Sequence, residues 1–575
     1  MSYASREVYE FISQQTSDPI IEWRTCDVSG TEFPIFQSDK DFLDKISPSF
    51  AGQKFVIPLP TICPEERERR RLLFRNERKL YRRKCSASGA DIISMYSPDK
   101  TLKIYDYKIW RSDNRDAMDY WREFDFSKTF TENFKLLYYD VPQMSLKIQN
   151  SENSDYTNLS IGNKSSYLCA GWDFWENCMY STFSFYSLWI VDSYRIFNSQ
   201  YISNSIYLQS CSSCHYCQSC KDCYHCIWCY RCEWCQFCYR CTNLVNKKYM
   251  INNVQYTKEE YDAFMIDNTD YSYIDWSPIK NIGTKIINSE LCHGNNIENS
   301  KHCILSTEMQ WSEYDKYCFL NSELHYSYDT NHSWHQSSYI YNTESVTESF
   351  SIVMSLYCRW QNNNLLYCTE CYNNTHHCFW CIWLRNKSYC IFNKQYTQED
   401  YEIQVAKIIA HMQSSGERWG FFHSSLSPFG YNETVAYEYY PLSPSEAWTK
   451  GYKRQINNYD PIIPAWVDTL CKKYLSDRER SMLRETDDIL KKIIICESSG
   501  RPFRIIRQEL DYYRAHHLPL PSHHPDVRHE QRNKLRPWKQ LFLRNCIACG
   551  TTMLSVYETE ENIYCESCYQ KEVFG

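Results

Sequence analysis

Every third position from Cys211 to Cys241 carries a cysteine, and the two residues between successive cysteines are mostly polar or aromatic. An α-helix turns 300° in three residues, so these side chains would spread around its circumference; in a strand, positions i and i+3 face opposite sides. Polyproline II repeats every three residues, but this stretch contains neither Pro nor Gly. The period therefore predicts a tight solenoid of short sides and corners, with small thiols inside and Tyr, Trp, His, Arg and Gln outside.

The end of the coil occurs twice along the chain. CTNLVNKKYMINNVQYTKEEY from Cys241 is repeated as CIWLRNKSYCIFNKQYTQEDY from Cys381. Each copy leads into a helical pattern, which predicts a helical cap. We expect a first solenoid segment with the cysteine ladder over residues 121–262, a second segment over 263–411, and a connector over 412–490.

The two ends of the chain carry the same sequence marks in the same order. Cys26, Cys63 and Cys85 match Cys496, His524 and Cys546, and PLPT before Cys63 matches PLPS before the histidines. We therefore expect duplicated zinc-ribbon-like modules over residues 1–120 and 491–575. The predicted fold is mainly β: a central cysteine-lined β-solenoid in two segments, flanked by duplicated α+β end modules.

The C-terminal copy contains a complete set of metal ligands. Its pattern is Cys-x2-Cys, fifteen residues, Cys-x2-Cys, formed by Cys546, Cys549, Cys565 and Cys568. Four thiolates satisfy tetrahedral zinc and leave no position for a catalytic water. The matching N-terminal positions hold only one good ligand, since they are Cys85, Ser88, Asp106 and Ile109. The sequence therefore predicts one structural Zn²⁺ site.

The cysteine ladder has other interpretations. Closely spaced thiols also bind zinc or copper in metal-thiolate clusters, and redox chemistry is a third use. A cluster without a core has no need of rings such as Trp228 and Phe237, whereas a packed coil gains by burying part of each ring, so structural thiols are favoured. A smaller set has the composition of a zinc site but not the spacing of a familiar finger: Cys292, His293, His302 and Cys303.

The stretch from Arg67 to Lys84, RERRRLLFRNERKLYRRK, holds ten basic residues against two acidic ones and is expected to be helical. Arginine at this density with Phe and Tyr is typical of proteins that grip phosphates and stack on bases. The alternative is a solvated face that nearby glutamates partly neutralise. The candidate nucleic-acid contacts are Arg69, Arg70, Arg75, Arg78, Arg82, Arg83, Phe74 and Tyr81.

Composition bounds the location of the protein and its class. The 575 residues are too many for one core, and a net charge of -7 excludes a general polycation. No apolar run follows Met1, and no segment approaches the roughly 20 apolar residues of a membrane span. We therefore expect a cytoplasmic protein with no membrane segment, whose 31 cysteines are reduced thiols plus a metal site.

Several stretches together resemble one bacterial family, among them CPEERERRRLLFRNERKLYRRKC, ISMYSPDK, NSENSDYTN, SLSPFGYNETVA and FRIIRQELDYYR. They are similar to a cysteine-rich, zinc-ribbon-containing family from the reduced genomes of candidate-phyla bacteria, over nearly the whole chain. That family often bears a CoA-transferase label of the CaiB/BaiF type, which no motif in this sequence supports. The resemblance implies the same architecture in a bacterial cytosol, with the four C-terminal cysteines as zinc ligands, and it supplies no mechanism.

The motifs favour binding over catalysis. The chain has no Gly-rich phosphate loop, no Gly-x-Ser-x-Gly elbow and no His-Glu-x-x-His. We expect a non-enzymatic zinc-binding scaffold that contacts RNA, a ribosome or another polyanion through the Arg-rich stretch, or else an acidic protein. The alternatives are a purely protein–protein scaffold and a polysaccharide-binding or polysaccharide-cleaving solenoid.

Overall fold

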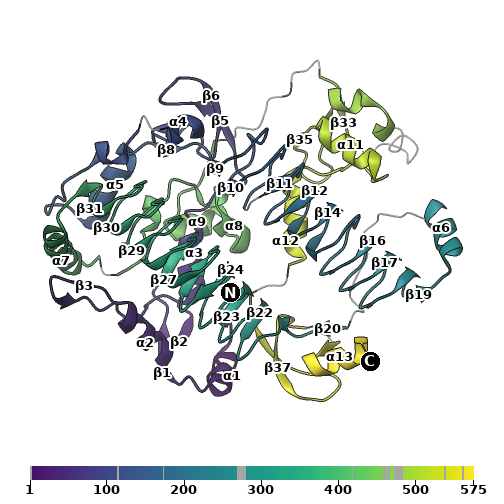
Figure 1. Cartoon of the computed structure of the whole chain (residues 1–575), viewed down its shortest axis with the longest axis horizontal. Coiled ribbons are helices and arrows are strands. Elements are labelled where there is room, and N and C mark those ends of the chain that lie inside the picture. The colour runs from purple at the N-terminus through teal and green to yellow at the C-terminus, as the bar shows by residue number, and fades with distance from the viewer. Residues whose placement is uncertain are drawn as a thin grey trace.

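The chain forms a mainly β structure around a β-solenoid of about 19 turns between residues 148 and 391, as its computed structural model shows (Figure 1). The predicted fold class is therefore confirmed. The structure describes residues 3–112, 115–171, 174–267, 280–417, 419–457, 463, 467–471, 483–536, 539–559 and 562–574. Among the helices that these residues form, none combines the length and the apolar character that a bilayer crossing requires.

Most turns of the solenoid contain twelve residues in four sides of three. Parallel pairing joins residues twelve apart, as in Cys226 with Cys238. The amide of His215 donates to the carbonyl of Cys226 (3.0 Å), and the amide of Trp228 donates to the carbonyl of His215 (3.0 Å). The third residue of each side is a left-handed corner, with φ of 56° at Tyr216 and 53° at Trp228. The sequence period of three is thus the period of the corners, each of which costs roughly 1–2 kcal/mol that the stacked turns must offset.

The two solenoid segments advance from the centre of the molecule toward opposite sides (Figure 1). The strands of the first segment are β9 (Ile148–Gln149), β10 (Ser160–Ile161), β11 (Trp175–Glu176), β12 (Ser187–Val191), β13 (Tyr194–Phe197), β14 (Gln200–Ser203), β15 (Ile206–Gln209), β16 (Tyr224–Ile227), β17 (Gln236–Tyr239) and β18 (Lys248–Ile251). Those of the second are β21 (Ile286–Ile287), β22 (His293–Glu298), β23 (Ile304–Gln310), β24 (Phe319–Ser322), β25 (Leu324–His325), β26 (Tyr328–Asn331), β27 (Ser337–Glu344), β28 (Phe350–Val353), β29 (Asn363–Leu366), β30 (His376–Phe379) and β31 (Ser388–Ile391).

The inward positions of the turns are filled in two different ways. In one turn of the first segment large and small buried residues alternate, namely Ile190, Ser193, Ile196 and Ser199. In the ladder, buried cysteines of intermediate size take all of these places. Each thiol also lies near backbone carbonyls, since Sγ of Cys226 is 3.6 Å from the oxygens of both Tyr224 and Cys235. Cysteine therefore fills the core at nearly constant volume while its weak S–H donor faces a carbonyl.

Replacing Cys226 by Ala is expected to lower the free energy of unfolding by only about 1 kcal/mol, because a single buried sulfur is removed. Cys226→Ser should be tolerated as well, since Ser193 occupies an inward position and its hydroxyl donates to the carbonyl of Val191 (2.8 Å). Urea unfolding of both variants, with metal content measured in parallel, checks this. Loss of metal in either variant would show instead that the ladder is a ligand array.

Both segments end in the same way. A short antiparallel strand closes each coil, β19 (Val254–Gln255) against β18 and β32 (Lys394–Gln395) against β31. A helix then follows, α6 (Lys258–Asp267) or α7 (Gln398–Ser414), and packs on the last coil strand. Thr397 caps α7, because its hydroxyl accepts a hydrogen bond from the amide of Asp400 (3.1 Å). Both helices lie where a helical cap was expected, and they cover coil edges that would otherwise expose unpaired backbone groups.

The two ends of the chain repeat the same elements in the same order. The N-terminal set is β1 (Ile20–Thr25), β2 (Glu32–Phe36), α3 (Pro64–Leu72), β5 (Tyr81–Lys84), β6 (Asp91–Ser94), β7 (Ile104–Tyr105) and α4 (Tyr107–Arg111). The C-terminal set is β34 (Ile493–Ile495), β35 (Pro502–Phe503), α12 (Pro525–Lys534), β36 (Phe542–Asn545), β37 (Thr552–Ser555), β38 (Ile563–Tyr564) and α13 (Glu566–Phe574). Around them lie α1 (Arg6–Thr16), α2 (Gln37–Ile46), β3 (Ser49–Phe50), β4 (Gln53–Lys54), α5 (Phe130–Asp140), α8 (Val435–Tyr439), α9 (Pro444–Thr449), β33 (Thr469–Leu470) and α11 (Arg507–Ala515).

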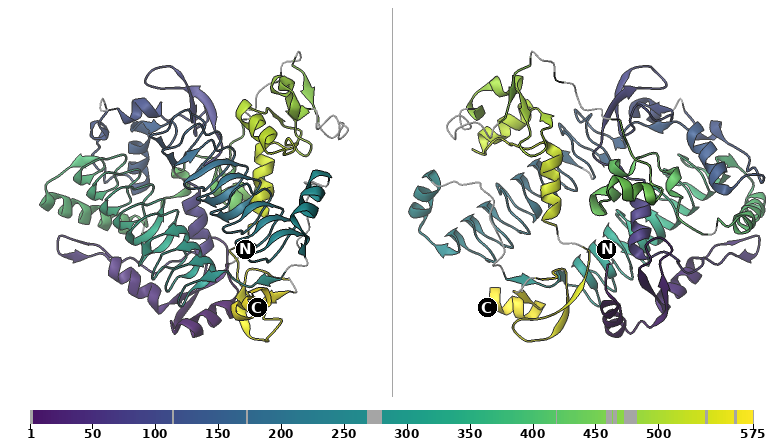
Figure 2. Two further views of the ribbon diagram at one scale, coloured as in Figure 1. Left: turned by 45° about the vertical axis from the view of Figure 1, so that its right-hand side comes forward. Right: turned by 180° about the vertical axis from the view of Figure 1, so that it is seen from behind.

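Each end module joins one segment by strand pairing and the other through a helix. β7 pairs with β8 (Gln143–Met144), which leads into the first segment, and β38 pairs with β20 (Asn281–Ile282), which leads into the second. Helix α3 nevertheless packs against β26 and β27 of the second segment, whereas α12 lies against the first (Figure 2). The two halves of the chain are therefore interlocked.

Buried ion pairs of the same design hold both helices. We define the Asp329 clamp as Arg67 and Arg71 of α3 with Asp329, at 2.9 and 3.4 Å. The Asp192 clamp consists of Arg528 and Arg532 of α12 with Asp192, the second contact at 2.9 Å. In each clamp the two arginines are four residues apart, and all six side chains are buried. The clamps thus join distant parts of the chain, and removal of the aspartate would leave two buried arginines without their carboxylate.

Glu509 of α11, next to the Asp192 clamp, is expected to make stability depend on pH. Burial raises the pKa of Glu509 to about 7, although Arg528 opposes this change. Because its pKa is raised on folding, this carboxyl group adds stability at pH values below its unfolded-state pKa of about 4.3. That stability is lost as the pH rises to the folded-state pKa of about 7, at roughly 1.4 kcal/mol for each pH unit between the two pKa values. Glu509→Gln should remove this loss and be more stable than the wild type at about pH 8. Unfolding midpoints across this range check it, and parallel curves for the two proteins would refute it.

Candidate metal centre

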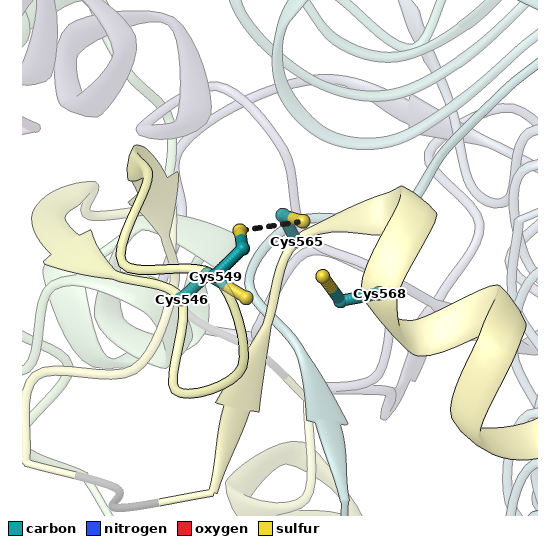
Figure 3. Close-up of side chains that lie close together, drawn as sticks. All are labelled: Cys546, Cys549, Cys565 and Cys568. Atoms are coloured by element: carbon teal, nitrogen blue, oxygen red, sulfur yellow. Dashed lines mark hydrogen bonds between the residues drawn. The ribbon is translucent and has the colours of Figure 1, made fainter.

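Four cysteines converge in the C-terminal module (Figure 3). Two come from the turn between β36 and β37, and two from the start of α13. The amide of Gly550 donates to the carbonyl of Cys546 (2.8 Å), and Gly550 has a φ of 75°, which a side chain would strain. The amide of Ile547 donates to the carbonyl of Ile563 (2.9 Å), which ties this turn to the strand before Cys565.

The sulfur geometry fits a tetrahedral ion. All four Sγ atoms of Cys546, Cys549, Cys565 and Cys568 lie within 4.8 Å of one another, and those of Cys549 and Cys565 are 3.8 Å apart. A tetrahedron with Zn–S bonds of about 2.3 Å has edges of about 3.8 Å. Cys546 is buried, Cys549 is exposed, and the other two are partly exposed. The cluster could therefore hold a metal ion, as predicted from the spacing.

Local hydrogen bonds favour the thiolate form, which a soft metal binds, at Cys549 and Cys565. The Thr551 hydroxyl lies 3.3 Å from Sγ of Cys549, and its hydroxyl and amide lower the pKa of Cys549 to about 6. Cys565 also lies next to a hydroxyl, that of Ser567, at 3.3 Å. Four thiolates would complete the coordination of the ion and leave no site for water or substrate.

The same turn recurs three times without a full ligand set. In each case the cysteine amide donates to a carbonyl five residues later, at 2.8 to 2.9 Å, and the cysteines are Cys26, Cys85, Cys496 and, in the metal centre, Cys546. A residue at the start of a helix lies opposite each turn. In the three incomplete copies this residue is the helix N-cap Cys63, Asp106 or His524. In the metal centre the same place is taken by Cys565. Within the described residues the C-terminal cluster is the one group of three or more His, Cys, Asp or Glu side chains that could hold a metal ion. One turn in four therefore carries a full set of four cysteine ligands.

The ladder thiols belong to the solenoid core. Cys217, Cys220 and Cys229 are buried, and the Sγ atom of each lies 3.3 to 3.6 Å from two backbone carbonyl oxygens. In the smaller set of cysteines and histidines, Cys292 and Cys303 are buried, whereas the ring of His302 stacks on Tyr314 at 4.8 Å. Both observations favour structural thiols over metal ligands.

The Arg-rich stretch does not form one exposed helix, so this part of the prediction is wrong. Helix α3 ends at Leu72, and the stretch finishes as strand β5. Arg69, Arg75 and Phe74 are buried. Arg75 donates to Glu77 (2.5 Å) and to Glu344 of the second segment (2.9 Å), and Arg69 donates to Glu66 (2.5 Å). These three side chains are therefore closed off from a nucleic acid.

The remaining predicted contacts are divided between internal bonds and the surface. Arg78 donates to Asp526 (3.2 Å), and the Tyr81 hydroxyl donates to Glu433 (2.8 Å). Arg82 is exposed, and Arg70 and Arg83 are partly exposed. Glu66 and Glu77 are close in the sequence, but Glu344, Asp526 and Glu433 lie more than 250 residues from their partners, which the local charge count cannot show.

No protein-family model matches the chain, and no curated protein matches it in sequence. Sequence reasoning missed two sets of side chains, the two clamps and a group of cations around Arg111 and Arg359, because their members lie far apart in the chain. The four-residue spacing of arginine on both matching helices is the one signal that could have revealed the clamps.

Proposed function

We propose that the protein is a non-enzymatic scaffold whose C-terminal module is held by one structural zinc ion. The observation that supports this is the closed group of four cysteines, with one sulfur pair at the 3.8 Å edge of a zinc–thiolate tetrahedron. Zinc prefers such sulfur ligands, and a site of four thiolates supports structure rather than chemistry because no coordination position is open.

The module that carries the metal centre touches both solenoid segments. The Tyr569 hydroxyl donates to Oδ1 of Asn243 near the end of the first segment (2.9 Å). The amide of Val556 donates to the carbonyl of Gly283 at the start of the second (3.0 Å). The amide of Leu541 donates to the carbonyl of Tyr3 near the N-terminus (2.8 Å). A zinc ion that orders this module would therefore fix how the two segments are joined.

We propose that the scaffold binds another protein, in a reducing compartment that keeps the cysteines as thiols. Burial of most of the Arg-rich stretch weakens the case for RNA. Stacked rings along the outside weaken the case for polysaccharide, since His302, Tyr314, Tyr326 and Tyr339 follow one another at 4.8 to 5.5 Å. Their faces cover one another, and a sugar cannot stack on a covered face.

Purification of the full chain under reducing conditions, with metal counted per chain, tests this proposal. We expect about one zinc and a protein that copurifies after nuclease treatment. Absorbance at 260 nm that nuclease removes, together with loss of the copurifying partner, would favour RNA contact instead. A chain without zinc would contradict the structural metal site.

A further inference from the structure

A small cavity lies where the N-terminal module, the start of the first segment and the side of the second segment meet. Arg111 at the end of α4, Lys147 before β9, and Arg359 and Glu370 of the second segment line it, with Trp360 and Tyr372 among the walls. Arg359, Tyr372 and Arg385 follow one another in a single column of the solenoid. Three separate parts of the chain thus contribute side chains to one cavity.

Positive charge exceeds negative charge around this cavity. Its lining has three cations, Arg111, Lys147 and Arg359, against one carboxylate, Glu370, which leaves two positive charges over. Lys147 is paired with Glu370. Among the described residues no carboxylate forms a salt bridge with Arg111 or Arg359. Glu370 therefore pairs with Lys147 while its charge also acts on both lining arginines, and the excess of two cations remains.

The guanidinium groups also keep unused donors. Arg111 donates to the carbonyl of Ile148 (3.0 Å) and Arg359 to the Ser345 hydroxyl (2.8 Å). Nε of Arg359 and Nη2 of Arg385 are nevertheless buried without a hydrogen-bond partner. The guanidinium carbon of Arg385 lies 5.2 Å from the ring centre of Tyr372. A buried donor left unpaired costs about 1–3 kcal/mol, more when it is charged. Arg359 of the lining and Arg385 of the same column therefore keep hydrogen-bonding capacity that their contacts do not use.

Like charges act on one another behind the cavity as well. The guanidinium of Arg115 lies 4.2 Å and that of Arg385 5.3 Å from the ring centre of Trp110. Burial and, in addition, the charge of Arg385 lower the pKa of Arg115 to about 10. An anion in the cavity would relieve this repulsion.

We propose that this cavity, the Arg111–Arg359 site, binds a phosphate group, either free phosphate or a small phosphate monoester. Its volume of about 40 Å³ suits a phosphate-sized group, since one water needs roughly 10–15 Å³. A phosphate monoester carries about -1.5 to -2 charges at neutral pH, which matches the excess of two cations. Guanidinium forks bind phosphate oxygens in pairs, which is the geometry that the two lining arginines offer.

Isothermal titration calorimetry of the full chain with inorganic phosphate and with glycerol 3-phosphate tests the site. We expect saturable binding that Arg359→Gln and Arg111→Gln each weaken about tenfold, or about 1.4 kcal/mol. Equal affinity for both probes would identify the phosphate group as the recognised chemistry, and preference for one would identify its source. No saturable binding of either probe would overturn the proposal.

Two further variants separate charge from folding. Arg359→Lys keeps the positive charge and should bind phosphate better than Arg359→Gln, while Glu370→Gln frees Lys147 and should tighten binding. Arg6→Gln, an exposed arginine of α1 that pairs with Glu10, is the matched control and should bind like the wild type. Weaker binding in Glu370→Gln, or unchanged binding in Arg359→Gln and Arg111→Gln, would refute the site. Thermal melts of all variants show which of them remain folded.

Discussion

Removing the metal ion is expected to release the part of the C-terminal module from β36 to α13 from both solenoid segments, whereas α12 stays held by the Asp192 clamp. This part has few buried residues of its own, and its β38 pairs with β20 at two positions, Asn281 with Ile563 and Ile282 with Tyr564. Structural zinc sites supply about 10–16 kcal/mol of apparent binding free energy in small zinc-finger peptides, which is also their folding free energy. Without the ion, the turn at Cys546 and the start of α13 lose the link that holds them together.

Hydrogen exchange is the measurement that localises this effect. The amides of Asn281 and Gly283, which donate to Asn562 (2.8 Å) and Tyr564 (3.1 Å), should lose protection on chelation and in Cys568→Ser. Amides inside the ladder should keep theirs, because its thiols are not ligands. Cys471→Ser is the matched control, since Cys471 is partly exposed and lies outside the four-cysteine cluster. Full zinc content in Cys568→Ser, or unchanged protection at Asn281 after chelation, would show that the cluster does not hold the module.

The part of the fold that the sequence predicts is the segment with a short, regular repeat. Between Cys211 and Cys241 every inward position has the same residue type, so the corner period can be read directly. Earlier turns use the same geometry with Ile190, Ser193 and Ile196 inside, and the alternation of large and small residues hides the period. The metal ligands could be predicted for a similar reason, since both pairs lie within one short module.

Long-range pairing is the part that the sequence does not reveal. The same run of arginines could form a solvated surface, a phosphate-binding site or buried ion pairs. Only the positions of Asp329 and Glu344 in the folded chain decide between these three. The phosphate site has the same difficulty, because Arg111 and Arg359 become neighbours only when the N-terminal module docks beside the second segment. Local composition predicts elements, whereas these contacts depend on where the elements end up.

Asp329→Asn is expected to destabilise the interlocked core by about 3–5 kcal/mol, the usual cost of breaking a buried ion pair. Burial alone would lower the pKa of Arg67, but Asp329 outweighs it, and the pKa of Arg67 is raised. With an amide at position 329, the guanidinium groups of Arg67 and Arg71 would stay buried without a carboxylate partner in the clamp. Asp192→Asn should have a similar effect, because the Asp192 clamp repeats the arrangement on α12.

Urea unfolding, followed together with amide exchange in α3 and α12, measures the effect and its location. The matched control is Asp44→Asn, which breaks the exposed pair with Lys54 (2.8 Å) and should cost at most about 1 kcal/mol. If the clamp acts through unpaired charge, adding Arg71→Met to Asp329→Asn should cost less than the sum of the two single changes, because the second change removes a stranded cation. Additive costs, or an Asp329→Asn variant as stable as Asp44→Asn, would show that packing of α3 rather than its ion pairs holds the two halves of the chain together.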